Sequence, residues 1–316
     1  MVRYQPIDAF RGIAILGMVF FSVTIRLSSS LPDVLRHNVW GSVHLGDFIL
    51  PMFLFASGLS LSYYLQKEEK DRKTLFLKKV IRRFSILALV GISLSIFSAY
   101  GFLEMDEVML SALLFLICVA LSKLNWKAFL IIIFLINISY IVLIQFDRLD
   151  IFFGHYLGGY PAALYYLPVM LTGLTLGKGI ISDGLWCERN KIVIFIIFTF
   201  FILFLPFIPL NKMTASPTFI MLSILLSFLI FIIFENIISS KHSFKKLEYI
   251  GRKPLRYWLM MYVIFIIPLW FYADFTKQNL PLDINWIIAI FVSLGLLILF
   301  YTISRLIEYI NNFKLK

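Results

Sequence analysis

The stretch IVIFIIFTFFILFLPFIPL, residues 192–210, decides the fold class of this chain. It is long enough to cross a hydrocarbon core of about 30 Å, and similar apolar stretches recur along the whole sequence. Only helices and closed barrels can cross lipid, because every backbone polar group must be satisfied internally. The stretch lacks the apolar and polar alternation of a barrel strand. We therefore expect an all-α, polytopic helical membrane protein.

The composition of the chain supports this class. Of its 316 residues, 60% are hydrophobic and 33 are Phe, and the mean hydropathy is +0.90. The net charge of +11 is better explained by basic cytoplasmic loops than by a nucleic-acid partner, so no nucleic acid is expected. The two cysteines, Cys118 and Cys187, show no metal-binding spacing and are not expected to pair. No metal is expected.

About ten apolar stretches are expected to span the membrane: residues 10–27, 43–65, 84–103, 108–122, 128–146, 162–181, 192–210, 217–238, 255–273 and 286–307. The first lacks a cleavage site and is expected to be a retained helix. Placing the N-terminus inside puts all but five of the 29 Lys and Arg residues on the inner side. The five exceptions are Arg26, Arg36, Arg148, Lys212 and Lys277. This bias predicts a multi-pass protein of the cell membrane with both termini cytoplasmic.

No linker, composition shift or internal repeat divides the chain, so residues 1–316 are expected to form a single transmembrane domain. Ionisable residues lie near the ends of the expected spans, and none falls at the centre of one. Ion-coupled carriers and pumps usually keep such a residue at depth, where the ion binds. The pattern argues against a proton-coupled transporter but leaves a passive carrier open.

Scarce polar side chains gather in RHNVWGSVHLGDFILPMFLFASG, residues 36–58, at the outer end of the second expected span. A histidine there, His37 or His44, can accept a proton from an attacking amine or hydroxyl. The carboxylate of Asp47 can orient and stabilise the imidazolium. Simpler interpretations are an interfacial histidine, a headgroup-level anchor for Trp40 and a helix-capping role for Asp47.

The pattern of His37, Trp40, Asp47, Pro51 and Gly58 resembles the first lumenal loop and second helix of the heparan-alpha-glucosaminide N-acetyltransferase family. The preceding RYQPIDAFRGIAILGMVFF, residues 3–21, is similar to the opening of that family and its prokaryotic relatives. The resemblance implies a transmembrane acyltransferase in which His37 is the catalytic base and Asp47 its supporting carboxylate. His44 is the alternative base, but the family spacing favours His37. Trp40 is placed with the substrate-binding residues.

Three downstream stretches resemble the family more weakly: YLPVMLTGLTLGKG (166–179), PLNKMTASPTF (209–219) and YIGRKPLRYWLMMY (249–262). In the second, Asn211, Lys212 and Ser216 are expected to bind substrate. Lys212 could steer an anionic glycan or donate to a thioester oxygen, or it could simply extend to the membrane interface.

Basic residues on the inner side are expected to bind the phosphates of the acyl donor. Arg252, Lys253 and Arg256 surround Pro254, which suits the first position of a helix. A topogenic basic loop attracted to anionic headgroups is the alternative. Arg11 lies three residues after Asp8, so the two can form an ion pair on one helical face. The resemblance also makes Arg11 part of the fold or of the donor path.

The leading hypothesis is a membrane acyltransferase. It would move an acyl group, in the first instance an acetyl group, from cytoplasmic acetyl-CoA or another acyl-CoA. The acceptor would be a hydroxyl or amine of an extracytoplasmic glycan, and the active site would face outward. The expected partners are this co-substrate, a sugar acceptor and membrane lipids, and a homodimer is among the oligomeric states left open. The alternatives are a carrier or flippase for a lipid-linked or small amphiphilic solute, and a scaffold without activity.

Overall fold

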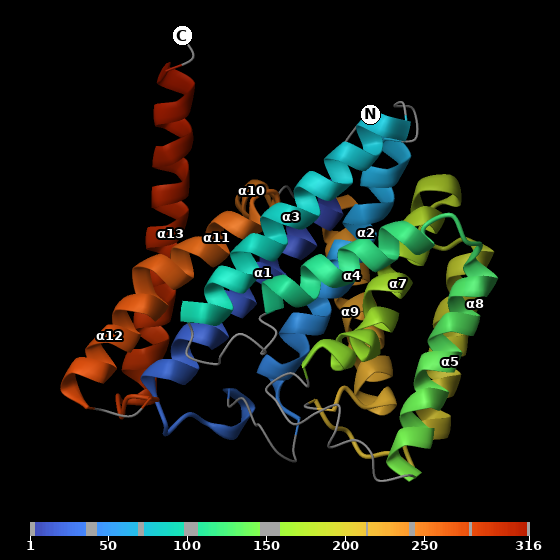
Figure 1. Ribbon diagram of the computed structural model, residues 1–316, viewed down its shortest axis with the longest axis horizontal. Coiled ribbons are helices and arrows are strands. Elements are labelled where there is room, and N and C mark those ends of the chain that lie inside the picture. The colour runs from blue at the N-terminus through green and yellow to red at the C-terminus, as the bar shows by residue number, and fades with distance from the viewer. Residues whose placement is uncertain are drawn as a thin grey trace. The chain divides into compact units, whose positions relative to one another are not determined.

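The computed structural model describes residues 4–35, 43–68, 73–97, 107–145, 159–212, 214–239, 244–277 and 280–314, and helices make up most of them (Figure 1). Contacts divide the chain into two compact units, residues 1–38, 44–49 and 233–316, and residues 39–43 and 50–232. The single domain expected from the sequence therefore stays a prediction.

The first unit contains α1 (Gln5–Leu27), the 3₁₀ turns η1 (Asp33–Leu35) and η2 (Leu45–Phe48), α10 (Lys245–Gly251), α11 (Pro254–Met260), the π-helical η4 (Met261–Ile266), α12 (Ile267–Thr276) and α13 (Trp286–Lys314). The second contains nearly all of α2 (Ile49–Glu68), then α3 (Lys73–Phe97), α4 (Glu107–Leu121), α5 (Trp126–Gln145), α7 (Gly159–Asp183), α8 (Glu188–Phe204) and most of α9 (Pro217–Ser239).

Every expected span overlaps a helix, which confirms the helical class. Among the described residues, seven helices are long and apolar enough to cross a membrane: 5–27, 45–66, 126–143, 164–183, 217–238, 254–276 and 286–312. A shorter apolar helix, α4, has 15 residues. The count of ten spans and the cytoplasmic position of the termini stay predictions.

In the first unit, α1 packs against α10, α11 and α13. Two glycines let α1 and α10 meet backbone to backbone. A Cβ on Gly12 would lie 2.2 Å from the carbonyl oxygen of Leu247, and one on Gly251 would lie 1.8 Å from that of Asp8. Any side chain at either position would collide with the main chain, so only glycine permits this approach.

The helix that crosses residues 254–276 changes its winding in the middle, at η4. Pro268 lies in the first turn of α12, directly after the π-helical segment. A proline has no N–H to donate, and its ring clashes with the carbonyl four residues earlier. The wider π turn takes up this disruption.

In the second unit, α7 lies at the centre and packs against α4, α5 and α8. It meets α2 through reciprocal glycine contacts. A Cβ on Gly58 would lie 2.2 Å from the carbonyl oxygen of Met170, and one on Gly173 would lie 2.3 Å from that of Phe55. Such small-residue crossings suit membrane helices, whose association depends on close packing rather than on the hydrophobic effect.

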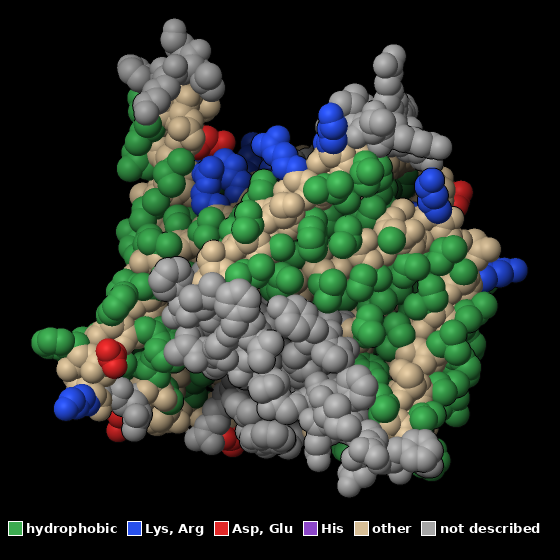
Figure 2. Space-filling model, in the orientation of Figure 1, with side chains coloured by type: hydrophobic (Ala, Val, Ile, Leu, Met, Phe, Trp, Pro, Cys, Tyr) green, Lys and Arg blue, Asp and Glu red, His purple; other side chains and the backbone are tan. Residues whose placement is uncertain are grey.

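Large apolar side chains cover the outward faces of helices in both units (Figure 2). On α13 the side chains of Phe291, Ile298 and Tyr309 are exposed, and on α5 those of Ile131 and Leu135 are exposed. Surfaces of this kind are costly in water but suit contact with lipid. The exposed faces therefore agree with the membrane class.

The α2–α7 crossing gives a direct test of the packing. Gly58→Ala should lower stability by about 2 kcal/mol, because the new methyl group would overlap the Met170 carbonyl. Gly295→Ala on α13 is the matched control, since a Cβ there meets nothing within 4 Å. It should be neutral or stabilise by up to about 1 kcal/mol. Thermal unfolding of the purified variants in detergent measures both, and equal unfolding temperatures would contradict the crossing.

Candidate functional site

Of the polar motif at residues 36–58, the structure describes the part from residue 43 onward, which leads into α2. His37 and Trp40 lie in residues 36–42, outside the described part of the chain, so their roles stay predictions. Asp47 lies in η2 and is completely buried. Its Oδ2 atom accepts a hydrogen bond of 2.8 Å from the backbone N–H of His44, and its own backbone N–H donates to the His44 carbonyl at 3.0 Å.

The contacts of Asp47 confirm the capping interpretation of this residue without testing its catalytic one. The carboxylate closes the 3₁₀ turn on His44, the alternative base, through the main chain. The turn is held against α1, because a Cβ on Gly46 would lie 2.9 Å from the ring of Phe21. Asp47 is thus fixed against the C-terminal half of α1. Its support of a neighbouring imidazole stays a prediction.

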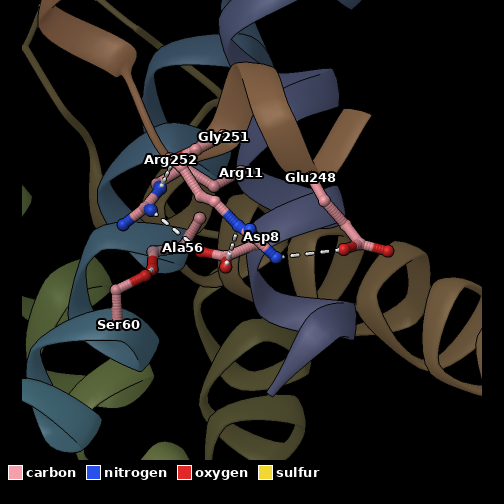
Figure 3. Close-up of polar contacts among 7 residues, drawn as sticks. All are labelled: Asp8, Arg11, Ala56, Ser60, Glu248, Gly251 and Arg252. Atoms are coloured by element: carbon pink, nitrogen blue, oxygen red, sulfur yellow. Dashed lines mark hydrogen bonds and ion pairs between the residues drawn. The ribbon is translucent and has the colours of Figure 1, made fainter. Parts of the chain in front are cut away.

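A polar cluster joins the N-terminal part of α1 to the end of α10 (Figure 3). The Arg11 Nη2 atom donates to Asp8 Oδ1 at 3.0 Å, which confirms the ion pair expected from their spacing. The Arg11 Nε atom donates to the carbonyl oxygen of Gly251, the last residue of α10. Arg11 therefore satisfies a helix-end carbonyl that has no partner within its own helix.

Arg252 completes the cluster. Its Nε atom donates to Asp8 Oδ2 at 3.3 Å and its Nη2 atom to Glu248 Oε2 at 3.2 Å. The carboxylates of Asp8 and Glu248 thus face two guanidinium groups (Figure 3). The Arg11 side chain is 9% exposed, whereas that of Arg252 is 40% exposed. Arg11 is thus committed to the fold, while Arg252 keeps a surface that a ligand can reach.

A second basic cluster joins the loop after α10 to α13. Lys253 Nζ lies 2.9 Å from Glu308 Oε1, and Arg256 Nη1 donates to the carbonyl oxygen of Ser304 at 3.1 Å. The Lys253 ammonium also lies 4.4 Å from the centre of the Tyr249 ring, a cation–π distance. As expected, α11 begins at Pro254. The three predicted donor-binding residues are Arg252, Lys253 and Arg256. They are neighbours in the sequence, and the structure gives each of them a protein partner.

The loop before α9 contains the other predicted substrate residues. The Ser216 Oγ atom accepts from the backbone N–H groups of Asn211 at 3.0 Å and of Phe219 at 3.3 Å. Ser216 is thus the N-cap of α9, with Pro217 as its first residue. The expected roles of Asn211 and Ser216 in substrate binding stay predictions.

Lys212 is the least expected member of this loop, because its side chain is buried rather than extended toward solvent. Its carbonyl accepts a hydrogen bond of 3.1 Å from the Tyr166 hydroxyl, which anchors the loop to α7. Burial favours the neutral amine and lowers the pKa of Lys212 from 10.5 to about 7. An amine in this state can either donate a hydrogen bond or accept a proton near neutral pH.

Sequence reasoning missed several partners that complete these clusters. Glu248 and Ser304 lie outside the stretches that resemble the family, and Gly251 lies in one of them without a predicted contact. Gly251 and Ser304 contribute through their carbonyl oxygens. One sequence signal for these contacts was available, because a glycine stands next to each arginine, Gly12 after Arg11 and Gly251 before Arg252. These glycines mark the close approach of the α1 and α10 backbones.

The described features define a class: a polytopic helical membrane protein with polar clusters at both ends of its first helix. The chain also matches the family model described as "Heparan-alpha-glucosaminide N-acetyltransferase, catalytic" over residues 3–191. It belongs to this family, and the family implies a transmembrane acetyltransferase. The match contains the outer motif and Arg11 but ends before Lys212 and Arg252. No curated protein matches the chain.

The role of Arg11 in the fold can be measured. Arg11→Ala would leave the Asp8 carboxylate and the Gly251 carbonyl short of a buried donor, and should cost about 3 kcal/mol of stability. Arg11→Lys should fall between this variant and the wild type, because one ammonium cannot reproduce the guanidinium fork. As a control, Glu188→Gln removes an exposed i,i+3 ion pair and should cost less than about 1 kcal/mol. Similar unfolding temperatures for Arg11→Ala and the control would contradict this role.

The burial of Lys212 predicts how stability depends on pH. Between about pH 7 and pH 10.5 the unfolded chain holds a proton on this amine that the folded chain has released. Stability should therefore rise with pH across this interval, and Lys212→Met should flatten the rise. Lys127→Met, at an exposed lysine, should leave the slope unchanged. Thermal unfolding at a series of pH values tests this, and parallel curves for the wild type and Lys212→Met would refute it.

Proposed function

We propose that the protein transfers an acetyl group from cytoplasmic acetyl-CoA to an amine or hydroxyl of an extracytoplasmic glycan. The observation that carries the proposal is the family match over residues 3–191, which contains the whole His37–Asp47 motif. The membrane-spanning helices support the membrane setting, because a donor in the cytoplasm and an acceptor outside require a protein that reaches both sides.

The proposed chemistry assigns the proton to His37. The imidazole removes a proton from the acceptor N–H or O–H as that atom attacks the thioester carbonyl. A new C–N or C–O bond forms, the C–S bond breaks, and coenzyme A leaves as a thiolate that takes up a proton. Asp47 would stabilise the imidazolium. In the alternative order the acetyl group passes first to His37 and then to the acceptor. Radiolabelled acetyl-CoA added without acceptor distinguishes the two, because only the second order labels the protein at His37.

The donor phosphates would bind the basic segment 252–256. Arg252 contributes an exposed guanidinium, and Arg256 contributes donors beyond its bond to Ser304. A guanidinium binds phosphate through parallel N–H···O bonds, which suits the adenosine end of coenzyme A. Each of these arginines is already fixed by a protein contact, so little side-chain entropy would be lost on binding.

The first helix relates the two proposed subsites within the first unit. Asp8 and Arg11 contact the end of α10, whereas Phe21 lies against the turn that holds Asp47. Thirteen residues separate Asp8 from Phe21, which is about 20 Å along a helix. A basic cluster and a carboxylate at opposite ends of one spanning helix suit a reaction whose donor and acceptor lie in different compartments.

The enzyme is tested with His37→Ala. The variant should lose acetyl transfer to a glucosamine-containing acceptor yet still be stabilised by acetyl-CoA. At a hundredfold excess over Kd, that stabilisation is about 2.7 kcal/mol. Arg252→Ala should reduce the stabilisation, because a phosphate partner is lost. Transfer by His37→Ala at the wild-type rate would remove His37 as the base. No stabilisation of the wild type by any acyl-CoA would favour the carrier instead.

A further inference from the structure

The second unit has an open groove of about 340 Å³ on its surface, remote in sequence from the predicted catalytic motif. Its apolar wall is formed by Phe195 and Phe198 of α8 with Leu225 and Phe228 of α9. Its volume falls in the range of small-molecule sites, about 300–1,000 Å³. The Phe195 side chain is 69% exposed, so no described residue covers the groove at this position.

The groove has one polar end, formed by Trp186 and Lys191. Lys191 and Phe198 lie seven residues apart on α8, so the apolar wall extends about 10 Å along the helix from the position of Lys191. Trp186 packs edge-on against Phe228, with 6.3 Å between the ring centres, and is 57% exposed. An exposed tryptophan beside a lysine is typical of the level of lipid headgroups.

The polar end is held rigidly. The buried Asn190 side chain donates to the carbonyl oxygens of Leu185, at 2.9 Å, and Leu176. These bonds fix the loop that carries Trp186 onto α7. The groove is thus pre-formed, which lowers the entropy that a ligand must lose on binding.

The charges at this end select the class of headgroup. Between residues 183 and 191, Arg189 and Lys191 balance Asp183 and Glu188, so the segment has no net positive charge that would attract an anion. Lys191 Nζ and Glu188 Oε1 lie 3.0 Å apart as an exposed ion pair. Such pairs contribute little and are readily exchanged for other partners. Together the two side chains offer a cation for a phosphate and an anion for an ammonium group.

We propose that this groove is a binding site for a zwitterionic phospholipid with an ethanolamine headgroup. One acyl chain lies along Phe195, Phe198 and Leu225. The phosphate contacts the Lys191 ammonium, and the lipid ammonium donates hydrogen bonds to Glu188. A choline headgroup carries the same charges but has no N–H to donate, and a glycerol headgroup leaves Glu188 without a cation. The site therefore prefers ethanolamine over both.

Native mass spectrometry of the full chain in detergent, with lipids of identical acyl chains, tests the proposal. The wild type should retain one ethanolamine lipid in preference to choline or glycerol lipids. Glu188→Gln should reduce that preference about fivefold, the equivalent of one exposed ion pair. Lys191→Gln should weaken retention of all three lipids, while Lys123→Gln, at an exposed lysine elsewhere, should change nothing.

The groove itself is tested with two tryptophan substitutions on α9. Leu225→Trp fills the apolar wall and should abolish retention, whereas Leu229→Trp, at an exposed position one turn on that does not line the groove, should preserve it. Unfolding temperatures equal to that of the wild type show that both variants fold. Equal retention by these two variants, or equal retention of the three headgroups by the wild type, would overturn the proposal.

Discussion

Hydrocarbon offers no hydrogen-bond partner to a peptide group, and this constraint decides where the helices of this protein can end. At three of the described polar clusters a side chain satisfies main-chain groups at the end of a helix. Arg11 donates to the last carbonyl of α10, Ser216 accepts at the start of α9, and Asp47 closes the turn before α2. Several side chains that the sequence suggests as catalytic or binding residues therefore have a structural role as well. Any role in binding or catalysis must use the hydrogen-bonding capacity that remains.

The helices could be predicted from the sequence because the signal for them is local. Each apolar stretch overlaps a helix, and Pro254 begins α11 as expected. The Asp8–Arg11 pair also followed from spacing alone. The number of spans could not be fixed in this way, because short apolar helices such as α4, with 15 residues, fall near the length that crosses a bilayer.

The site was less predictable because its contacts join distant parts of the chain. Arg11 and Gly251 are 240 residues apart, and no local pattern pairs them. The sequence predicted the pairing of Arg11 with Asp8 but not the partners of Arg252 and Lys253. In the structure Asp8 and Glu248 pair with the guanidinium groups of Arg11 and Arg252, and Glu308 pairs with Lys253. Lys212 shows the same difficulty, since its burial depends on how its loop packs on Tyr166.

Glycine contacts at both ends of α1 bear on how transfer across a membrane would work. Gly12 and Gly251 join its N-terminal half to α10, and Gly46 of η2 lies against the Phe21 ring in its C-terminal half. Close contacts of this kind resist sliding, because packed surfaces have few alternative arrangements. In the proposed reaction, the phosphates and the thioester occupy opposite ends of one extended donor. A donor held along a fixed helix would bring its acyl group toward the outer motif without a rearrangement of α1. A carrier, by contrast, must expose its site to each side in turn, a movement that the proposed direct transfer does not require.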